Sequence, residues 1–85
     1  MKLQLKFFAS LREALGISQE NVEIPDDIHT IADLRIYLTR RSDVWAQALA
    51  EGRALRCALN QEMVEANVAL QDGAEIAFFP PVTGG

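Results

Sequence analysis

TIADLRIYL, residues 30–38, is the stretch that decides the fold of this chain. Its large apolar side chains recur at the spacing of one helix face: Ile31, Leu34 and Leu38. The hydroxyl of Thr30 can cap the start of this helix, and Asp33 in the first turn is favoured by the helix dipole. Because a helix with a single apolar stripe covers only one face of a sheet, the stretch predicts one main helix packed on one sheet.

Strand patterns lie on both sides of this helix. Residues 2–8 alternate, so that Leu3, Leu5 and Phe7 point to one face and the residues between them to the other. Further strands are predicted at residues 21–24, 55–59, 63–65 and 75–79. The order of two strands, a helix and more strands predicts an α+β fold of the β-grasp type, a mixed sheet wrapped on one main helix.

Two short extra helices are expected beside the main one. Ser10 and Glu13 match the S-x-x-E capping box, and Gly16 can end that helix in the left-handed conformation. A second short helix is predicted from Asp43, as its cap, to Gly52.

The composition describes one small globular domain. The chain has 85 residues, of which 49% are hydrophobic, and this length supports a single core. Eight Lys and Arg against twelve Asp and Glu give a net charge of -4. An acidic balance argues against nucleic acid as a partner and favours a basic protein surface.

Residues inside the domain offer little chemistry. Cys57 is the only cysteine, which excludes an internal disulfide or a cysteine-bound cluster, and alternation places it in the core. His29 has no potential metal-ligating residue at a suitable spacing, so we interpret it as a solvated loop residue rather than a metal ligand. The N-terminal residues lack the apolar run of a signal peptide or membrane span, so we expect a cytoplasmic protein with no membrane partner.

The last eight residues, FFPPVTGG, form the stretch with the clearest functional pattern. Pro80 and Pro81 lack the N–H that continues a sheet ladder, so the chain leaves the sheet extended. The five residues after Pro80 can span roughly 17 Å, and the two glycines make the end thin and mobile. We therefore predict a β-grasp domain over residues 1–80 and a flexible, extended Gly-Gly tail over residues 81–85. Such a tail can thread a narrow tunnel and present an unhindered carboxylate at Gly85.

Four motifs together resemble the small subunit of molybdopterin synthase, a ubiquitin-like sulfur carrier. They are KLQLKFFASLRE, TIADLRIYL, ALNQEMV and the final AFFPPVTGG. The resemblance covers essentially the whole chain, and the ending is its most specific part.

The resemblance implies a carrier whose working group is the Gly85 carboxylate. An ATP-dependent adenylyltransferase similar to ubiquitin-activating enzymes forms a transient acyl-AMP on Gly85, and a sulfur donor enzyme then supplies the sulfur of a thiocarboxylate. The large synthase subunit receives the tail, with Pro81, Val82, Thr83 and Gly84 inserted. There the thiocarboxylate attacks cyclic pyranopterin monophosphate. By this resemblance the carrier is not an enzyme by itself, binds no permanent cofactor, and forms a heterotetramer of two small and two large subunits.

Strand alternation also predicts where the large subunit binds. Phe8, Met63 and Phe79 are expected on the outer sheet face, away from the main helix, as exposed apolar anchors. Three acidic residues are expected to ring them: Glu62, Glu65 and Glu75.

Three other functions fit parts of the pattern. A thiamine-pathway sulfur carrier shares the fold and the Gly-Gly end, but those chains tend to be shorter and lack the FFPPVT stretch. A ubiquitin-like protein modifier and a plain β-grasp interaction module are the other two alternatives. A cluster-binding ferredoxin is excluded by the single cysteine.

Overall fold

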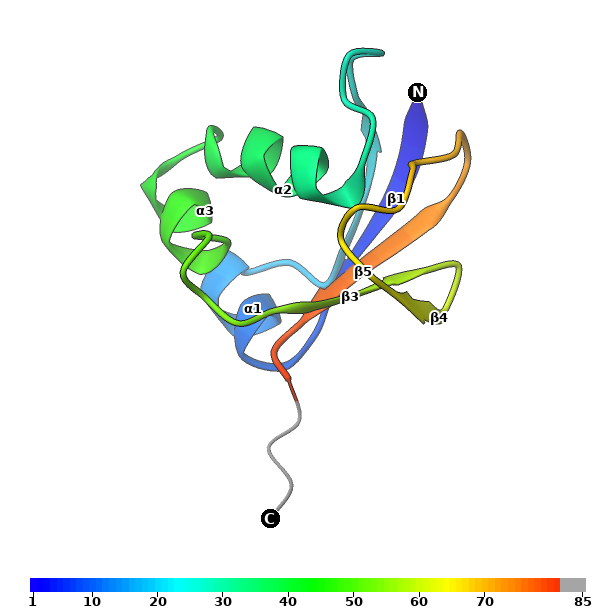
Figure 1. Ribbon diagram of the computed structural model, residues 1–85. Helices are drawn as coiled ribbons and strands as arrows, with labels where there is room; N and C mark the ends of the chain where they lie inside the picture. The colour runs from blue at the N-terminus through cyan, green and yellow to red at the C-terminus, as the bar shows by residue number, and fades with distance from the viewer. Residues whose placement is uncertain (82–85) are drawn as a thin grey trace.

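The computed structural model describes residues 1–81, in which three helices and five strands follow one another (Figure 1). The first half contains β1 (Lys2–Phe7), α1 (Ala9–Leu15), β2 (Gln19–Glu23), α2 (Ile31–Thr39) and α3 (Asp43–Ala48). The second half contains β3 (Arg56–Leu59), β4 (Glu62–Val64) and β5 (Glu75–Phe79). The predicted α+β order is confirmed. The predicted division into residues 1–80 and 81–85 stays a prediction, because residues 82–85 lie outside the described part.

The strands form one mixed sheet in the order β2-β1-β5-β3-β4. β1 and β5 run parallel, with Leu5 opposite Ile76, whereas the other neighbouring strands pair antiparallel. The helices gather on one side of this sheet (Figure 1). This is the β-grasp arrangement that the sequence predicts, and it puts β5 at the centre of the sheet.

The main helix begins as its sequence predicts. The Thr30 hydroxyl oxygen accepts a hydrogen bond from the Asp33 N–H at 3.1 Å, and the Asp33 carboxylate accepts one from the Thr30 N–H at 3.1 Å. The same carboxylate also accepts from the His29 N–H at 3.2 Å. These backbone hydrogen bonds to the ionised form lower the pKa of Asp33. The capping box therefore fixes the N-terminus of α2.

The core lies between the inner face of the sheet and α2. Ile31, Leu34 and Leu38 of the predicted stripe are all buried. Phe7 of β1 stacks on Phe78 of β5, with ring centroids 6.2 Å apart. Each such large apolar side chain contributes about 1.5–3 kcal/mol when fully buried. The packing of α2 on the two central strands therefore holds the sheet in its register.

The predicted cap of α1 is wrong. The helix begins at Ala9, its N-cap residue is Phe8, and no side chain caps it, so the predicted capping-box pair lies inside the helix. The cause is the sheet, because the Phe8 N–H still donates to the Phe78 carbonyl at 3.3 Å and holds the chain in the strand up to that residue. Ala9 then turns the chain with a φ of 55°. Ser10 and Glu13 follow too late to cap. The predicted end is confirmed, since Gly16 adopts a left-handed φ of 76°.

The predicted limits of the second short helix are also wrong. Ser42, not Asp43, is the N-cap residue of α3, and its hydroxyl accepts from the Trp45 N–H at 3.4 Å. The helix ends at Ala48, before Gly52. A tertiary contact explains the early end: Arg35 of α2 donates to backbone carbonyl groups that follow α3. A cation from another helix therefore satisfies these carbonyl groups, and no further helical turn is needed.

The remaining strand predictions are correct to within two residues, and β5 agrees at both ends. Asn60 and Gln61 both have positive φ, 49° and 70°, and connect β3 to β4 as a two-residue hairpin. Within residues 1–81 no helix is long and apolar enough to cross a membrane.

Candidate functional site

The predicted tail begins where β5 ends. Phe79 is the last strand residue, and Pro80 and Pro81 follow it, both partly buried. Neither proline has an N–H group for the sheet ladder, so the strand cannot extend through them. Val82, Thr83, Gly84 and Gly85 lie outside the described residues, so their predicted roles stay predictions.

The pairing of the strands determines which side chains share the outer face of the sheet, next to the end of β5. Lys6 of β1, Ala77 of β5, Ala58 of β3 and Met63 of β4 are paired in turn across the sheet. Directly paired residues on neighbouring strands point to the same face, so these four side chains form one row. Lys6 alternates with the core residues of β1, so this row lies on the face away from α2.

The three predicted interface residues have different surroundings. Phe8 and Met63 are exposed, by 45% and 58%, which confirms their predicted exposure. Phe79 is only partly exposed, so its predicted exposure is wrong. The reason is Phe8, whose ring meets that of Phe79 edge to face, with centroids 6.3 Å apart. We call these two residues the Phe8–Phe79 pair.

The structure does not bring Met63 into the Phe8–Phe79 pair. Met63 lies on β4, and β3 separates that strand from β5. With neighbouring strands about 4.8 Å apart, two strand spacings put Met63 roughly 10 Å across the sheet from Phe79. The residues next to Met63 in its row are small, since Ala58 pairs with both Met63 and Ala77, and Phe79 lies two residues beyond Ala77 on β5. Met63 and the Phe8–Phe79 pair are therefore two separate large apolar groups on this face.

The charged rim of this face differs from the predicted acidic ring. Glu75 is paired with Lys6, with 3.3 Å between the ammonium nitrogen and a carboxylate oxygen. Arg56 of β3 is exposed and pairs directly with Phe79 across the strands. Glu62 and Glu65 are exposed, as expected. The rim therefore carries both signs, and the alternation that placed Phe8 on this face also predicts Lys6 there.

Cys57 and His29 lie outside this site. Cys57 is buried, which confirms the core prediction, and its thiol donates to the Val64 carbonyl at 3.4 Å. Burial raises the pKa of the Cys57 thiol, with Glu65 adding to the rise. His29 is exposed before α2, as expected. Among residues 1–81, no three metal-ligating side chains lie close enough together to hold an ion.

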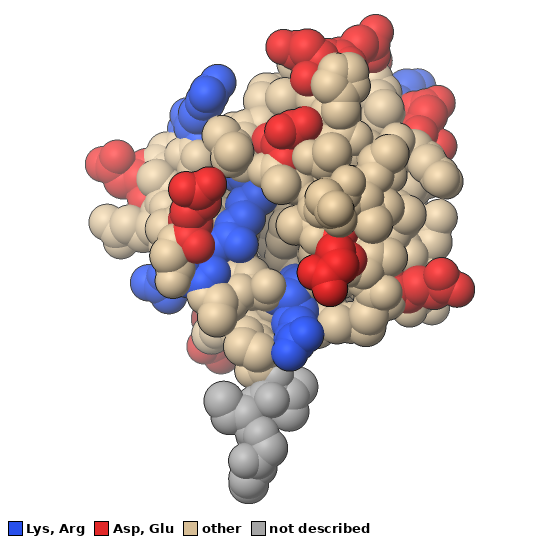
Figure 2. All heavy atoms as spheres, viewed as in Figure 1, with Lys and Arg blue, Asp and Glu red and all other residues tan. Residues whose placement is uncertain are grey.

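In the view of Figure 2, Asp and Glu side chains are spread over the whole face, whereas Lys and Arg lie mostly in its left and lower parts. Arg41, in the turn between α2 and α3, donates to both carboxylate oxygens of Glu20 on β2, at 2.8 and 2.7 Å. The Arg41 guanidinium also lies 4.5 Å from the centroid of the Trp45 ring. No local sequence pattern predicts the Arg41–Glu20 ion pair, since it depends on how β2 meets the turn between the two helices.

Comparison with known proteins agrees with the fold. The family model described as the ThiS family matches residues 5–85. The chain belongs to the ThiS family. A relative from Escherichia coli (strain K12), named molybdopterin synthase sulfur carrier subunit, is 43% identical over 83 residues, which cover 98% of this chain and 99% of the relative.

Two further similarities are to a modifier protein and to one chain of a two-subunit complex. Small archaeal modifier protein 3 of Haloferax volcanii is 33% identical over 93 residues, which cover 100% of both chains. The solved complex of subunits 1 and 2 of the molybdopterin-converting factor from Helicobacter pylori 26695 contains a chain with a TM-score of 0.65 and 25% identity, with 100% of both chains covered. The resemblance to the small subunit of molybdopterin synthase is thereby confirmed.

Proposed function

We propose that this ThiS-family protein is the sulfur-carrying small subunit of a molybdopterin synthase. The observation that carries the proposal is similarity over almost the full length to the E. coli sulfur carrier subunit. The structure supports it at the relevant end of the domain. The central strand β5 stops at Phe79, and two prolines lead directly into the last four residues of the chain, Val82 to Gly85.

The chemistry assigns the carried atom to the Gly85 carboxylate. A carboxylate is a poor electrophile, so the activating adenylyltransferase first joins it to AMP from ATP and releases pyrophosphate. Hydrosulfide supplied by the donor enzyme then attacks the acyl carbon and forms the carbon–sulfur bond, and AMP leaves with the electron pair of the broken carbon–oxygen bond. The product is a thiocarboxylate whose sulfur is a soft nucleophile. Cyclic pyranopterin monophosphate is the acceptor, and two deliveries supply the two sulfurs of the dithiolene.

The catalytic side chains belong to the partner in this proposal. The large synthase subunit receives Pro81, Val82, Thr83 and Gly84 and brings Gly85 to the acceptor. The outer sheet face, with the Phe8–Phe79 pair and Met63, contacts the same subunit in a heterotetramer of two small and two large subunits. The structural similarity to the Helicobacter pylori complex of subunits 1 and 2 supports such a partner.

Intact-mass measurement tests the carrier role. The full chain is incubated with its activating enzyme, ATP and a sulfur source, and we expect the mass gain of one oxygen-to-sulfur exchange. Deletion of Gly85 should abolish the gain and leave the fold intact, because the last described strand ends at Phe79, well before Gly85. A Gly85-deleted chain that still gains the mass contradicts the proposal.

A second candidate function is a ubiquitin-like protein modifier. The 33% identity to small archaeal modifier protein 3 is the observation that favours it. The same incubation separates the two functions when other proteins of the cell are added. A modifier forms stable amide bonds from Gly85 to lysine side chains, which appear as larger products that resist reducing agents. A carrier instead loses its sulfur to cyclic pyranopterin monophosphate and returns to its original mass.

A further inference from the structure

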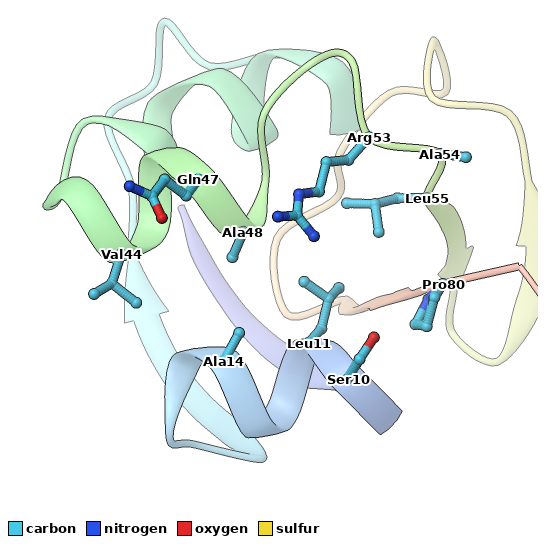
Figure 3. Close-up of a pocket in the computed structure, with 10 residues that line it drawn as sticks. All are labelled: Ser10, Leu11, Ala14, Val44, Gln47, Ala48, Arg53, Ala54, Leu55 and Pro80. Carbon is cyan, nitrogen blue, oxygen red and sulfur yellow. The ribbon is translucent and has the colours of Figure 1, made fainter.

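A pocket lies between α1 and α3, beside the point where β5 ends (Figure 3). Its volume is about 560 Å³. Its lining includes the apolar residues Leu11, Ala14, Val44, Ala48 and Leu55. Arg53, from the loop before β3, lies at its rim. We call this site the Arg53 pocket.

The backbone of Arg53 is held in place by two hydrogen bonds. Its N–H donates to the Ala50 carbonyl at 2.9 Å, and its carbonyl accepts from the Arg35 guanidinium at 2.8 Å. Arg35 also donates to the Leu49 carbonyl at 2.7 Å and to the Ala50 carbonyl. The main helix therefore fixes the loop that carries Arg53. A fixed loop lowers the entropy lost when a ligand contacts its side chain.

The Arg53 side chain points into the pocket from this fixed loop (Figure 3). Within residues 1–81 its guanidinium has no carboxylate at ion-pair distance and donates no hydrogen bond. Two nearby arginines differ from it, because Arg41 is paired with Glu20 and Arg35 donates to backbone carbonyls. An arginine held over an apolar floor presents up to five donors in a fixed plane, which suits a carboxylate.

We propose that the Arg53 pocket docks a segment of the protein that receives residues 82–85, through one carboxylate and one adjacent apolar side chain. The carboxylate would pair with Arg53 and the apolar side chain would cover Leu11 and Ala48. The inference rests on the proposed function, which supplies a tail-receiving partner. It adds a second contact surface, separate from the outer sheet face.

The position of the pocket explains why the occupant belongs to that same partner. Pro80 lines the pocket, whereas the preceding residue, Phe79, contacts Phe8 on the outer sheet face. A partner that encloses the chain beyond Pro81 therefore meets the pocket on one side of the exit and the Phe8–Phe79 pair on the other. Charge complementarity selects the chemistry, since Arg53 has no acidic partner within residues 1–81 and can pair with a carboxylate of the partner.

Binding of the large synthase subunit to the full chain tests the inference. We expect Arg53→Glu to raise Kd by about tenfold or more at moderate salt, the scale of an interface arginine whose charge is reversed. Ala14→Leu narrows the pocket from α1, the wall that does not carry Arg53, and we expect it to raise Kd as well. Arg40→Glu is the matched control, because Arg40 is exposed at the end of α2 and lines a different pocket. It changes the net charge equally and should leave Kd within about twofold at moderate salt.

Each outcome bears on a distinct conclusion. Thermal melts first confirm that the variants fold, which is expected because Arg53 and Ala14 are exposed. If the unaltered chain binds and both pocket variants bind equally well, the pocket inference is overturned and the proposed function stands. If the unaltered chain does not bind the large subunit, both are overturned.

Backbone NMR of the free protein tests the competing occupant, the chain's own last residues. If the chain's own last residues do not occupy the pocket, deletion of residues 82–85 should leave the amide chemical shifts of Ala14, Ala48 and Ala54 unchanged. Shifts in the free protein as large as those caused by the large subunit overturn the inference in favour of self-docking.

Discussion

Replacing Phe8 with alanine should weaken binding to the large synthase subunit by more than it lowers the free energy of unfolding. Phe8 is 45% exposed in the free domain. A phenylalanine that becomes fully buried removes about 200 Å² from water, so roughly 90 Å² of Phe8 remains for a partner to cover. At about 25 cal/mol per Å², this area is worth about 2 kcal/mol, or about 30-fold in Kd.

Replacing Phe79 with alanine should affect both binding to the large subunit and the free energy of unfolding. Because it is partly buried against Phe8, Phe79→Ala should weaken binding by about 1–3 kcal/mol and also lower the free energy of unfolding. The edge-to-face contact is worth about 0.5–1.5 kcal/mol, so the double variant should show a coupling energy of that size in its stability.

Calorimetric titration and thermal melts measure these two quantities separately. Ile36→Ala is the control, because Ile36 is a similarly exposed apolar residue, 42%, on α2 rather than on the outer sheet face. It should leave affinity unchanged. An unchanged Kd for Phe8→Ala, or a melt showing that this variant mainly unfolds, would refute the assignment of the outer face as the interface.

Two further predictions concern titratable groups. The backbone N–H groups of His29 and Thr30 lower the pKa of Asp33 below its usual 3.8. The ionised carboxylate therefore stabilises the fold above about pH 3.8, and this contribution is lost as the pH falls through the lower pKa that Asp33 has in the folded protein. Asp33→Asn should therefore lower the Tm at neutral pH, with a gap that closes in acid; a gap independent of pH contradicts the capping role. Burial raises the pKa of Cys57, so iodoacetamide at neutral pH should alkylate it far more slowly in the folded protein than in urea. Equal rates, followed by mass spectrometry, would show that the thiol is accessible.

The sequence was sufficient where one segment determines its own structure. The start of α2 depends on Thr30 and Asp33, which are three residues apart, and the prediction is correct to the residue. β5 is likewise bounded by its own signals, a turn at Gly73 and the prolines after Phe79. Local hydrogen bonding and φ preferences decide such features, so no knowledge of distant residues is needed.

The sequence was insufficient where a distant residue decides the outcome. Ser10 does not cap α1, because a bond from Phe8 to the last strand holds the chain in the sheet. The end of α3 depends on Arg35, and the partial burial of Phe79 depends on Phe8. The Arg53 pocket likewise exists only because two short helices meet beside β5. Alternation predicts the face on which a side chain lies, but not its neighbours there.

The central place of β5 has a consequence for how the protein reaches its folded state. β1 and β3 do not pair with each other, and both pair with β5. Until residues 75–79 have left the ribosome, the earlier strands can form only two separate hairpins, β1 with β2 and β3 with β4. Joining them closes a loop that spans most of the domain, which favours slow, all-or-none folding for a chain of this size. The residues that follow β5 therefore emerge from synthesis at nearly the same time as the fold that displays them.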